Sequence, residues 1–296
     1  MSDIALRTAE AAPAHPAALP RERPDWIAHA VLILGIVLFA LPVWIVLVGS
    51  TYDAASIGRG EVPLIPRADL STYAEIWDDG SGRQGATPVW RMLLNSGLMA
   101  LLIMAGKIVV SVLSAFAIAF FRFPGRMLFF WLIFLTLMLP VEVRIIPTYE
   151  VMAGLNLINS MTGLTLPLIA SATATLLFRQ VFLAIPDELV EAARVDGAGP
   201  LRFLRDILIP VSSTNIAALA VILFVYGWNQ YLWPLLVASD PQLDTIVIGI
   251  VKMIGSEAQT EWNRVMGTTV LALIPPIAIV LLMQRWFVKG LTEGEK

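Results

Sequence analysis

The stretch 92–121, MLLNSGLMALLIMAGKIVVSVLSAFAIAFF, contains a single charged residue, Lys107. A helix that crosses a bilayer needs about 20 predominantly apolar residues, and this stretch exceeds that length. The whole chain shares its character, because 57% of its 296 residues are hydrophobic and 15% are charged. An average soluble domain has about 25% charged residues. The composition therefore excludes an ordinary soluble globule and predicts a membrane protein.

Five further stretches are similarly apolar, and together the six predict an all-α membrane protein with six transmembrane helices. The other five are 26–52, 127–141, 151–178, 207–239 and 265–284. The stretch 127–141 is short, so we expect its helix to continue into the charged residues that follow it. The transmembrane domain then covers 26–289, between an N-terminal tail, 1–25, and a C-terminal tail, 290–296.

Lysine and arginine are distributed unevenly between alternate loops. Twelve of them fall in one set of segments and seven fall in the other, longer set. The richer set comprises 1–25, 122–126, 179–206 and 285–296. Because cytoplasmic loops retain positive residues, we expect both termini in the cytoplasm and the loop 53–90 outside. The Ala- and Pro-rich tail carries acidic residues and has no apolar core, so we expect a disordered cytoplasmic tail rather than a secretory signal.

The sequence contains no motif for catalysis or for a bound cofactor. It has no Cys and only two His, which excludes a disulfide framework and a metal site rich in Cys or His. Gly106 and Lys107 are followed by Ile108, where a phosphate-binding loop requires Ser or Thr. A net charge of −3, spread evenly, provides no basic stripe for nucleic acid. We therefore expect a protein that is not an enzyme, with no cofactor of its own and no nucleic-acid partner.

The segment 185–210, IPDELVEAARVDGAGPLRFLRDILIP, lies on the predicted cytoplasmic side. Pro186 and the acidic residues after it favour the start of a helix, and Gly197 can adopt the left-handed conformation that ends one. Ala192 and Ala193 leave one face of this helix without bulk, so another chain can approach it closely. The pattern predicts a short docking helix between two spans.

This segment resembles the cytoplasmic loop of the permease subunits of bacterial ABC importers of the maltose type. That loop carries Glu-Ala-Ala, three residues, Gly, nine residues and then Ile-x-Leu-Pro. The matching residues here are Glu191, Ala192, Ala193, Gly197, Ile207 and Pro210, with Ile209 in place of the usual Leu. The resemblance implies a type I ABC importer transmembrane domain. It also implies that the loop 184–206 carries a coupling helix that docks on an ATP-hydrolysing subunit.

Three further blocks are similar to the permease subunits of bacterial glycerol-3-phosphate importers. They are WRMLLNS at 90–96, LMLPVEVR at 137–144 and YGWNQYLWP at 226–234. The resemblance implies import of sn-glycerol 3-phosphate across the bacterial inner membrane. It also implies a second, homologous permease subunit, two ATP-binding subunits that hold the ATP and magnesium, and a periplasmic substrate-binding protein.

A dianionic substrate that crosses hydrocarbon needs positive charge along its path. Lys107 lies near the middle of a predicted span, where a lysine costs about 2.5 to 3.5 kcal/mol, so it is expected to face protein or water rather than lipid. It either contacts substrate or a gate, or pairs structurally with a carbonyl or a carboxylate of a partner. Arg144 has the same two interpretations, with a local ion pair to Glu142 as the structural one.

Polar residues on the predicted outer side have more than one interpretation as well. Trp228, Trp233 and Tyr231 are predicted to form an aromatic belt at the membrane interface. Trp228, Asn229 and Gln230 could equally line an outer gate. In the loop 53–90, a Thr and a Glu three residues apart, at 72 and 75, predict a capping box that begins a short helix. A periplasmic binding protein could dock on this loop.

Three other functions remain open at the level of sequence. An ABC permease for a neutral sugar or polyol would leave Lys107 purely structural. An ion-coupled secondary transporter would need carboxylates buried in its spans, and the predicted spans have no Asp or Glu near mid-membrane. A membrane scaffold without transport would leave the docking loop unexplained.

Overall fold

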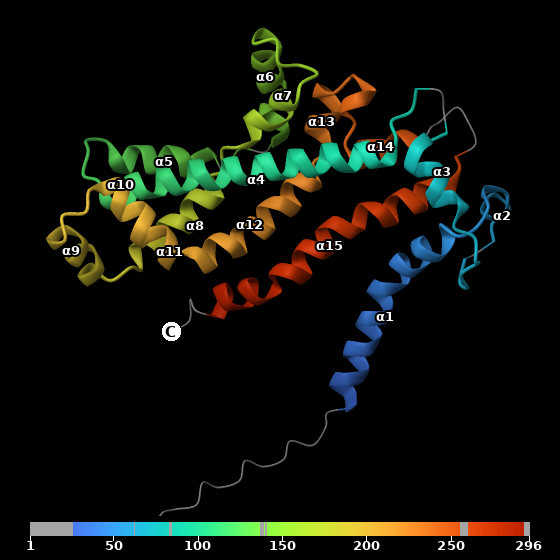
Figure 1. Ribbon diagram of the computed structural model, residues 1–296, viewed down its shortest axis with the longest axis horizontal. Helices are drawn as coiled ribbons and strands as arrows, with labels where there is room; N and C mark the ends of the chain where they lie inside the picture. Colours follow the sequence, from blue (N-terminus) through green and yellow to red (C-terminus); the bar gives the residue numbers. More distant parts are fainter. Residues whose placement is uncertain are drawn as a thin grey trace, which may run out of the picture. The chain divides into compact units, whose positions relative to one another are not determined.

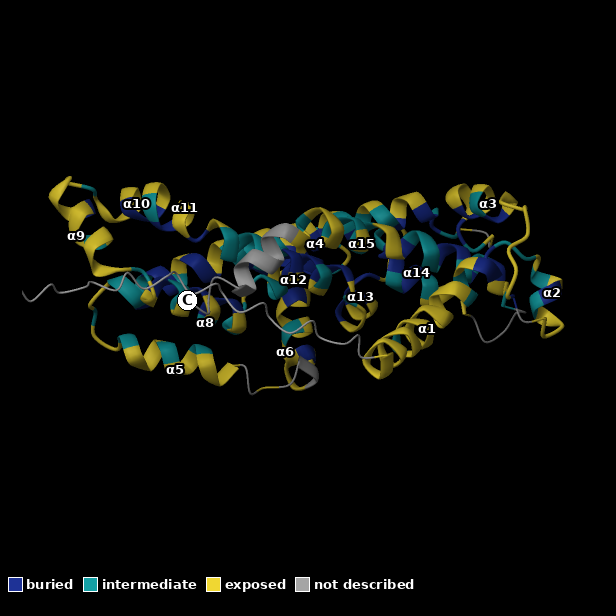
Figure 2. Ribbon diagram, turned by 90° about the horizontal axis from the view of Figure 1, so that it is seen from below, coloured by how far each residue is buried: buried dark blue, intermediate teal, exposed yellow. Residues whose placement is uncertain are grey.

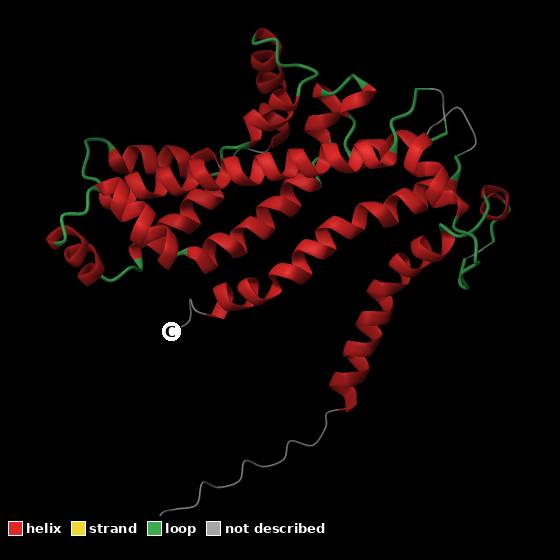
Figure 3. Ribbon diagram, in the orientation of Figure 1, coloured by secondary structure: helices red, strands yellow, loops and turns green. Residues whose placement is uncertain are grey.

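The computed structural model describes residues 26–61, 63–82, 85–136, 139, 141–254 and 260–292, with the side chains of 141–142 and 285–292 left out. Within these residues every regular element is a helix and no strand occurs (Figure 1; Figure 3). The predicted all-α fold is confirmed. The chain forms two compact units, 1–43 and 44–296.

The helices follow one another as shown in Figure 1. The α-helices are α1 Trp26–Gly49, α2 Ala54–Gly58, α3 Ser71–Asp79, α4 Val89–Phe120, α5 Arg126–Thr136, α6 Val141–Gly154, α7 Met161–Thr165, α8 Ala172–Leu183, α9 Asp187–Val195, α10 Pro200–Phe203, α11 Ile209–Val211, α12 Ser213–Trp228, α13 Leu232–Val237, α14 Ile246–Met253 and α15 Trp262–Thr292. Short 3₁₀ turns occupy Leu166–Leu168 and Pro241–Leu243, and a π-helical turn occupies Leu204–Leu208.

The described part of the first unit, 26–43, is helical and almost wholly exposed (Figure 2). Its side chains include no Asp, Glu, Lys or Arg, and large apolar ones such as Phe39 are up to 80% exposed. Contiguous apolar surface of this extent is unfavourable in water. A helix satisfies all of its own backbone hydrogen bonds, so this segment is suited to face lipid.

The core of the second unit is built along α4, which packs against α8 and α12. At the C-terminal end of α4, Phe116 lies in a cluster with Phe178 and Phe182 of α8. At its N-terminal end, Val89 and Met92 lie in a cluster with Ile76 of α3. Dark blue buried residues accordingly run along α4 and α12 in Figure 2, whereas α5 and α9 are mostly exposed.

The two ends of α4 carry different loops. Ile76 of α3, from the segment 53–90, packs at the N-terminal end. Ala193 and Phe203, from the loop 184–206, pack at the C-terminal end (Figure 1). Because α4 is long enough to cross a bilayer, this arrangement agrees with the prediction that the two loops lie on opposite sides of the membrane.

Among the described residues, helix length and apolar composition support three to five of the six expected spans. Three of the described helices are long and apolar enough to cross a membrane, namely α1, α4 and the part of α15 up to Gln284. Two bent helix pairs bring the number to five if each pair counts as one span. The remaining candidate, α5, has 11 residues, about 17 Å at 1.5 Å per residue. That is well short of a hydrocarbon core of about 30 Å. Helix α5 ends at Thr136, within the apolar run 127–141, and the next described helix, α6, begins at Val141.

The fourth and fifth spans also differ from their expected boundaries. Asn156 and Asn159 both have positive φ and separate α6 from α7, so the fourth span begins at Met161 and extends to Leu183 with a 50° bend. The fifth span covers 200–228 with a bend of 77° and stops well before residue 239. Apolar composition identified the stretches 151–178 and 207–239. It did not predict the turns within them, because those turns depend on single residues.

Candidate functional site

A cavity of about 440 Å³ lies beside α4, where the span formed by α7 and α8 is broken. Residues from several helices line it: Lys107, Val110, Ser114, Ile133, Thr136, Leu139, Arg144, Pro167, Leu168, Ala170, Ser171, Ala172, Thr173, Thr175 and Tyr226. Two of these residues are cationic and none is acidic. The side chains that the structure describes in the lining therefore carry a net positive charge.

Lys107 projects from α4 into this cavity and is only 6% exposed. Its Nζ atom lies 3.5 Å from the centre of the Tyr226 ring, which is a cation–π contact. No ion pair among the described residues involves Lys107. The expectation that Lys107 faces protein rather than lipid is confirmed. Tyr226, a partner that sequence reasoning did not single out, holds the ammonium group in place.

Arg144 of α6 lines the same cavity, so the structure brings together the two cations proposed for the substrate path. The side chain of Glu142, its expected ion-pair partner, lies outside the described residues. The described side chains form no ion pair with Arg144. Two positive groups on one cavity wall raise the local concentration of anions.

The N-terminus of α8 borders this cavity as well. Ser171 caps the helix, because its Oγ accepts a hydrogen bond from the backbone N–H of Ala174 at 3.3 Å. Ala172 and Thr173, in the first turn, are lining residues. The first N–H groups of a helix have no partner within it and carry partial positive charge. The break in the span thus places a third positive element at the cavity.

The three residues proposed for an outer gate do not line this cavity. Trp228 is buried and stacks on Phe224 with ring centres 5.8 Å apart. Gln230 donates from Nε2 to the carbonyl oxygen of Tyr226 at 3.0 Å, and Asn229 is exposed at the end of α12. Trp233 is buried too, and its Nε1 donates to the Gly163 carbonyl. The aromatic-belt interpretation is therefore wrong for both tryptophans, which belong to the protein core.

The loop 184–206 contains the helix that its sequence predicts. Helix α9 begins at Asp187 and ends at Val195, and Gly197 has a φ of +70°. The N–H of Ala198 donates to the carbonyl of Ala193 at 2.9 Å, and the N–H of Gly197 donates to that of Arg194 at 3.1 Å. This pair of bonds is a Schellman motif, which requires a left-handed residue at the position of Gly197.

The two alanines of this loop have different environments. Ala193 is only 4% exposed and packs with Phe116 and Phe203 in the cluster at the end of α4. Glu191, Ala192 and Gly197 are exposed. The expectation that both alanines form an open docking face is therefore wrong for Ala193, which instead lies in the apolar cluster at the end of α4. The sequence could not show which of the two alanines is buried, because it does not determine which side of this short helix faces the protein core.

Ile207 and Pro210 lie in the bend between α10 and α12. Ile207 is half-buried against the cluster around Phe116 and belongs to the π-helical turn Leu204–Leu208, and Pro210 lies in α11, two residues after that turn. Proline removes one helical hydrogen bond and clashes with the carbonyl four residues earlier, which explains the irregular turn and the 77° bend nearby. Ile207 and Pro210 therefore belong to the bent connection between the loop 184–206 and α12.

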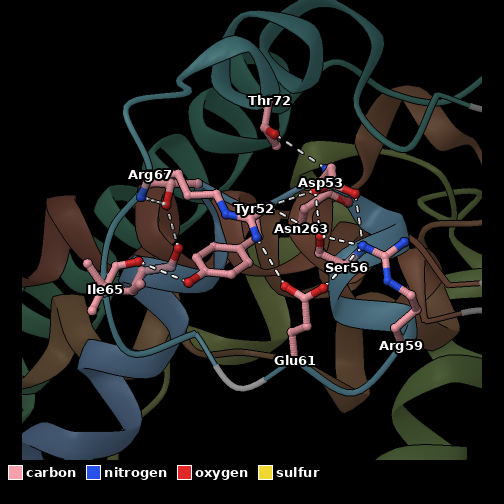
Figure 4. Close-up of polar contacts among 11 residues, drawn as sticks. Tyr52, Asp53, Ser56, Arg59, Glu61, Ile65, Arg67, Thr72 and Asn263 are labelled. Atoms are coloured by element: carbon pink, nitrogen blue, oxygen red, sulfur yellow. Dashed lines mark hydrogen bonds and ion pairs between the residues drawn. The ribbon is translucent and has the colours of Figure 1, made fainter.

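The segment 53–90 is organised by Arg67 (Figure 4). Its guanidinium donates to Asp53 at 2.9 Å and to Glu61 at 3.0 Å, and it lies 4.0 Å from the centre of the Tyr52 ring. Asp53 also caps α2, and hydrogen bonds from Ser56 together with the charge of Arg67 lower the pKa of Asp53. These contacts give the segment a defined conformation.

The expected short helix in this segment is present as α3, but its predicted capping box is wrong. Leu70 occupies the N-cap without a side-chain hydrogen bond. Glu75 pairs instead with Arg264 of α15 at 2.8 Å, and Thr72 accepts a hydrogen bond from Asn263 at 3.3 Å. Contacts with α15, distant in sequence, thus replace the local cap.

An ion pair that the sequence did not reveal joins the buried Asp244 to the partly exposed Lys252 of α14. Asp244 is 3% exposed, and Nζ of Lys252 lies 2.6 Å from its Oδ1. The backbone carbonyl of Asp244 also accepts from the Asn95 side chain at 3.0 Å. Burial raises the pKa of Asp244 above its ordinary value, and the hydrogen bond and charge of Lys252 oppose the rise.

Replacing Lys252 by Met should destabilise the protein at neutral pH by about 1–3 kcal/mol, because Asp244 then lacks a partner for its buried charge. A raised carboxyl pKa makes the folded state bind its proton more tightly, so the penalty should shrink as pH falls through that pKa. Thermal unfolding of the purified protein at neutral and acidic pH measures the change. The double variant with Asp244→Asn is the control and should recover much of the stability. An equal loss at both pH values would contradict the assignment.

Residues 107–293 match the family described as binding-protein-dependent transport system inner membrane component. The chain belongs to this family. It is 58% identical over 272 residues to the sn-glycerol-3-phosphate transport system permease protein UgpE of Rhizobium meliloti (strain 1021), with 91% of this chain and 96% of that protein covered. It is 57% identical over 274 residues to the protein of that name from Yersinia pestis, with 92% and 97% covered.

The fold of this permease is also found in a solved structure. The crystal structure of a bacterial ABC transporter involved in the import of the acidic polysaccharide alginate matches with a TM-score of 0.78 at 22% identity, over 92% of this chain and all of that one. This likeness confirms the type I ABC importer transmembrane fold. The permease is thus a multi-pass membrane component of a transport system whose other parts include an ATPase and a substrate-binding protein.

Proposed function

We propose that this permease imports sn-glycerol 3-phosphate in an ATP-driven ABC importer. The supporting observation is 57–58% identity, along more than nine-tenths of the chain, to proteins named as sn-glycerol-3-phosphate permeases. The cavity beside α4 agrees with an anionic substrate, because its lining includes Lys107 and Arg144, and no acidic side chain lines it within the part of the chain that the structure describes.

The complex proposed around the permease has four kinds of subunit. A second, homologous permease completes the membrane part, two ATP-binding subunits hold the ATP and magnesium, and a periplasmic binding protein delivers the substrate. We place both termini and the loop 184–206 in the cytoplasm, following the distribution of Lys and Arg. The segment 53–90, ordered around Arg67, then lies on the periplasmic side, where it can receive the binding protein.

The coupling role assigned to α9 is supported by its attachment to the core. Its exposed side carries Glu191 and Ala192, together with Val195, which is 87% exposed and free to enter a groove on another protein. Its inner side carries Ala193, which lies in the same apolar cluster as Phe116 of α4. When ATP binding moves the partner subunits, α9 therefore transmits the displacement to α4, the helix that also carries Lys107.

A neutral sugar or polyol is the second candidate substrate. The contact between Lys107 and Tyr226 favours it, because an aromatic ring can stabilise a buried ammonium group without any substrate anion. In that case, phosphate would add nothing to recognition by the permease.

Uptake by the assembled complex distinguishes the two candidates. Proteoliposomes that contain both permeases, the ATPases and the binding protein are given labelled sn-glycerol 3-phosphate with ATP inside. We expect uptake that unlabelled glycerol 3-phosphate abolishes and that glycerol and maltose leave unchanged. Uptake of labelled glycerol or maltose instead would reject the phosphate ester as the substrate.

A further inference from the structure

Lys107 is buried in a setting that does not neutralise its charge. A lysine at the centre of a span costs about 2.5 to 3.5 kcal/mol, whereas a desolvated cation–π contact returns about 2 kcal/mol. The structure gives Lys107 the ring of Tyr226 as a partner and no carboxylate within the described residues. Its Nζ has three donors, and an aromatic face engages only one side of the group.

Three positive elements from separate helices meet at the cavity. Lys107 comes from α4, Arg144 comes from α6, and the first turn of α8 presents Ala172 and Thr173. In transporters, a half-helix that begins at a break near mid-membrane can direct its N-terminus at an anionic substrate group. Here the break at 169–171 places that terminus beside a buried lysine.

The cavity has the size and the neutral donors that a small phosphate ester requires. Ligand pockets generally measure about 300–1,000 Å³, and this cavity measures about 440 Å³. Ser114 and Thr173 add hydroxyl groups to the lining. Each can donate to a phosphate oxygen or to a hydroxyl of the glycerol part.

We infer that this permease contains its own subsite for the phosphate group of the substrate, formed by Lys107, Arg144 and the N-terminus of α8. The inference rests on the proposed function and deepens it. Tyr226 holds the ammonium group in position before the substrate arrives, which lowers the ordering cost of binding. The phosphate dianion compensates both cations, while Ser114 and Thr173 contact the remainder of the ester.

Variants of the two cations test the subsite in the complete complex with its binding protein. Hydrogen bonds to charged groups contribute about 1.5–3 kcal/mol, so Lys107→Met should reduce uptake of sn-glycerol 3-phosphate by about tenfold or more. Arg144→Gln should reduce it in the same direction. Lys107→Arg, which keeps the charge, should retain most of the uptake. Assembly of the complex and ATP hydrolysis stimulated by the loaded binding protein should stay close to wild type in all three.

Arg91→Gln is the matched control, since it removes an exposed cation from the same helix as Lys107. It should leave uptake unchanged. Wild-type uptake in both Lys107→Met and Arg144→Gln would overturn the subsite, and so would a parallel loss of assembly and uptake in both, which indicates a structural role. Neither of these two results would contradict the proposed function, because the wild-type complex would still take up the phosphate ester. Failure of the proposed function would appear separately, as a wild-type complex that does not take up the ester.

Discussion

Replacement of Gly197 by Val is expected to uncouple ATP hydrolysis from transport. Gly197 has a φ of +70° and completes the Schellman motif that ends α9. A Cβ added there meets no atom within 4 Å, so the effect comes from the backbone and not from a clash. Strain at such a position is about 1–3 kcal/mol, which predicts a fall in uptake of about tenfold with basal ATP hydrolysis retained. Proteoliposomes containing the full complex give both rates.

Two controls separate backbone strain from the bulk of the new side chain. Gly197→Asn should stay close to wild type, because Asn tolerates the left-handed conformation. Gly199→Val places the same side chain two residues away, at a φ of −66° and with open space around its Cβ, and should also transport normally. Normal uptake in Gly197→Val would show that the conformation at the end of α9 is not needed for coupling.

The second large effect is expected from Gly227→Val, at the closest approach of α12 to α4. A Cβ at Gly227 would lie 2.9 Å from the Cα atom of Ala100 and 3.3 Å from its carbonyl oxygen. Both are backbone atoms of a long helix and cannot move aside alone. Since small residues let membrane helices approach closely, the larger side chain should force α4 and α12 apart. Overpacking costs about 1–3 kcal/mol and occasionally more, so we expect little folded protein.

Gly97→Val on α4 is the control, because a Cβ there meets nothing within 4 Å. The yield of monodisperse protein after extraction in mild detergent, together with its thermal unfolding, compares the two variants. The packing account would be wrong if Gly227→Val gave wild-type yield and thermal stability.

Local chemistry predicted the features that depend on short stretches of chain. The apolar run 92–121 and the lack of charge in 26–52 identified two spans, because burial in lipid depends on composition over about 20 residues. The start of α9 at Asp187 was indicated by Pro186 and the acidic residues after it. The end of α9 at Val195 was indicated by Gly197, which takes the left-handed conformation two residues later. The resemblance carried by Glu191, Ala192, Ala193, Gly197, Ile207 and Pro210 predicted the family to which residues 107–293 match.

Features that depend on distant contacts could not be predicted in this way. Glu75 pairs with Arg264 rather than capping α3, and Trp233 donates to Gly163 in the core. Tyr226 is over a hundred residues from Lys107 in sequence, so nothing local indicated the cation–π contact between them. A hydropathy profile does not detect the bends in the fourth and fifth spans, because it averages over a window of residues and contains no information on the angle between helices.

Binding-protein-stimulated ATP hydrolysis tests the central claim most directly. The assembled complex in proteoliposomes is given its binding protein with sn-glycerol 3-phosphate, with maltose or with no ligand, and phosphate release from ATP is measured. We predict stimulation by sn-glycerol 3-phosphate alone. Stimulation by maltose and none by the phosphate ester would contradict the substrate assignment, and a permease that assembles with no ATPase would contradict the coupling role as well.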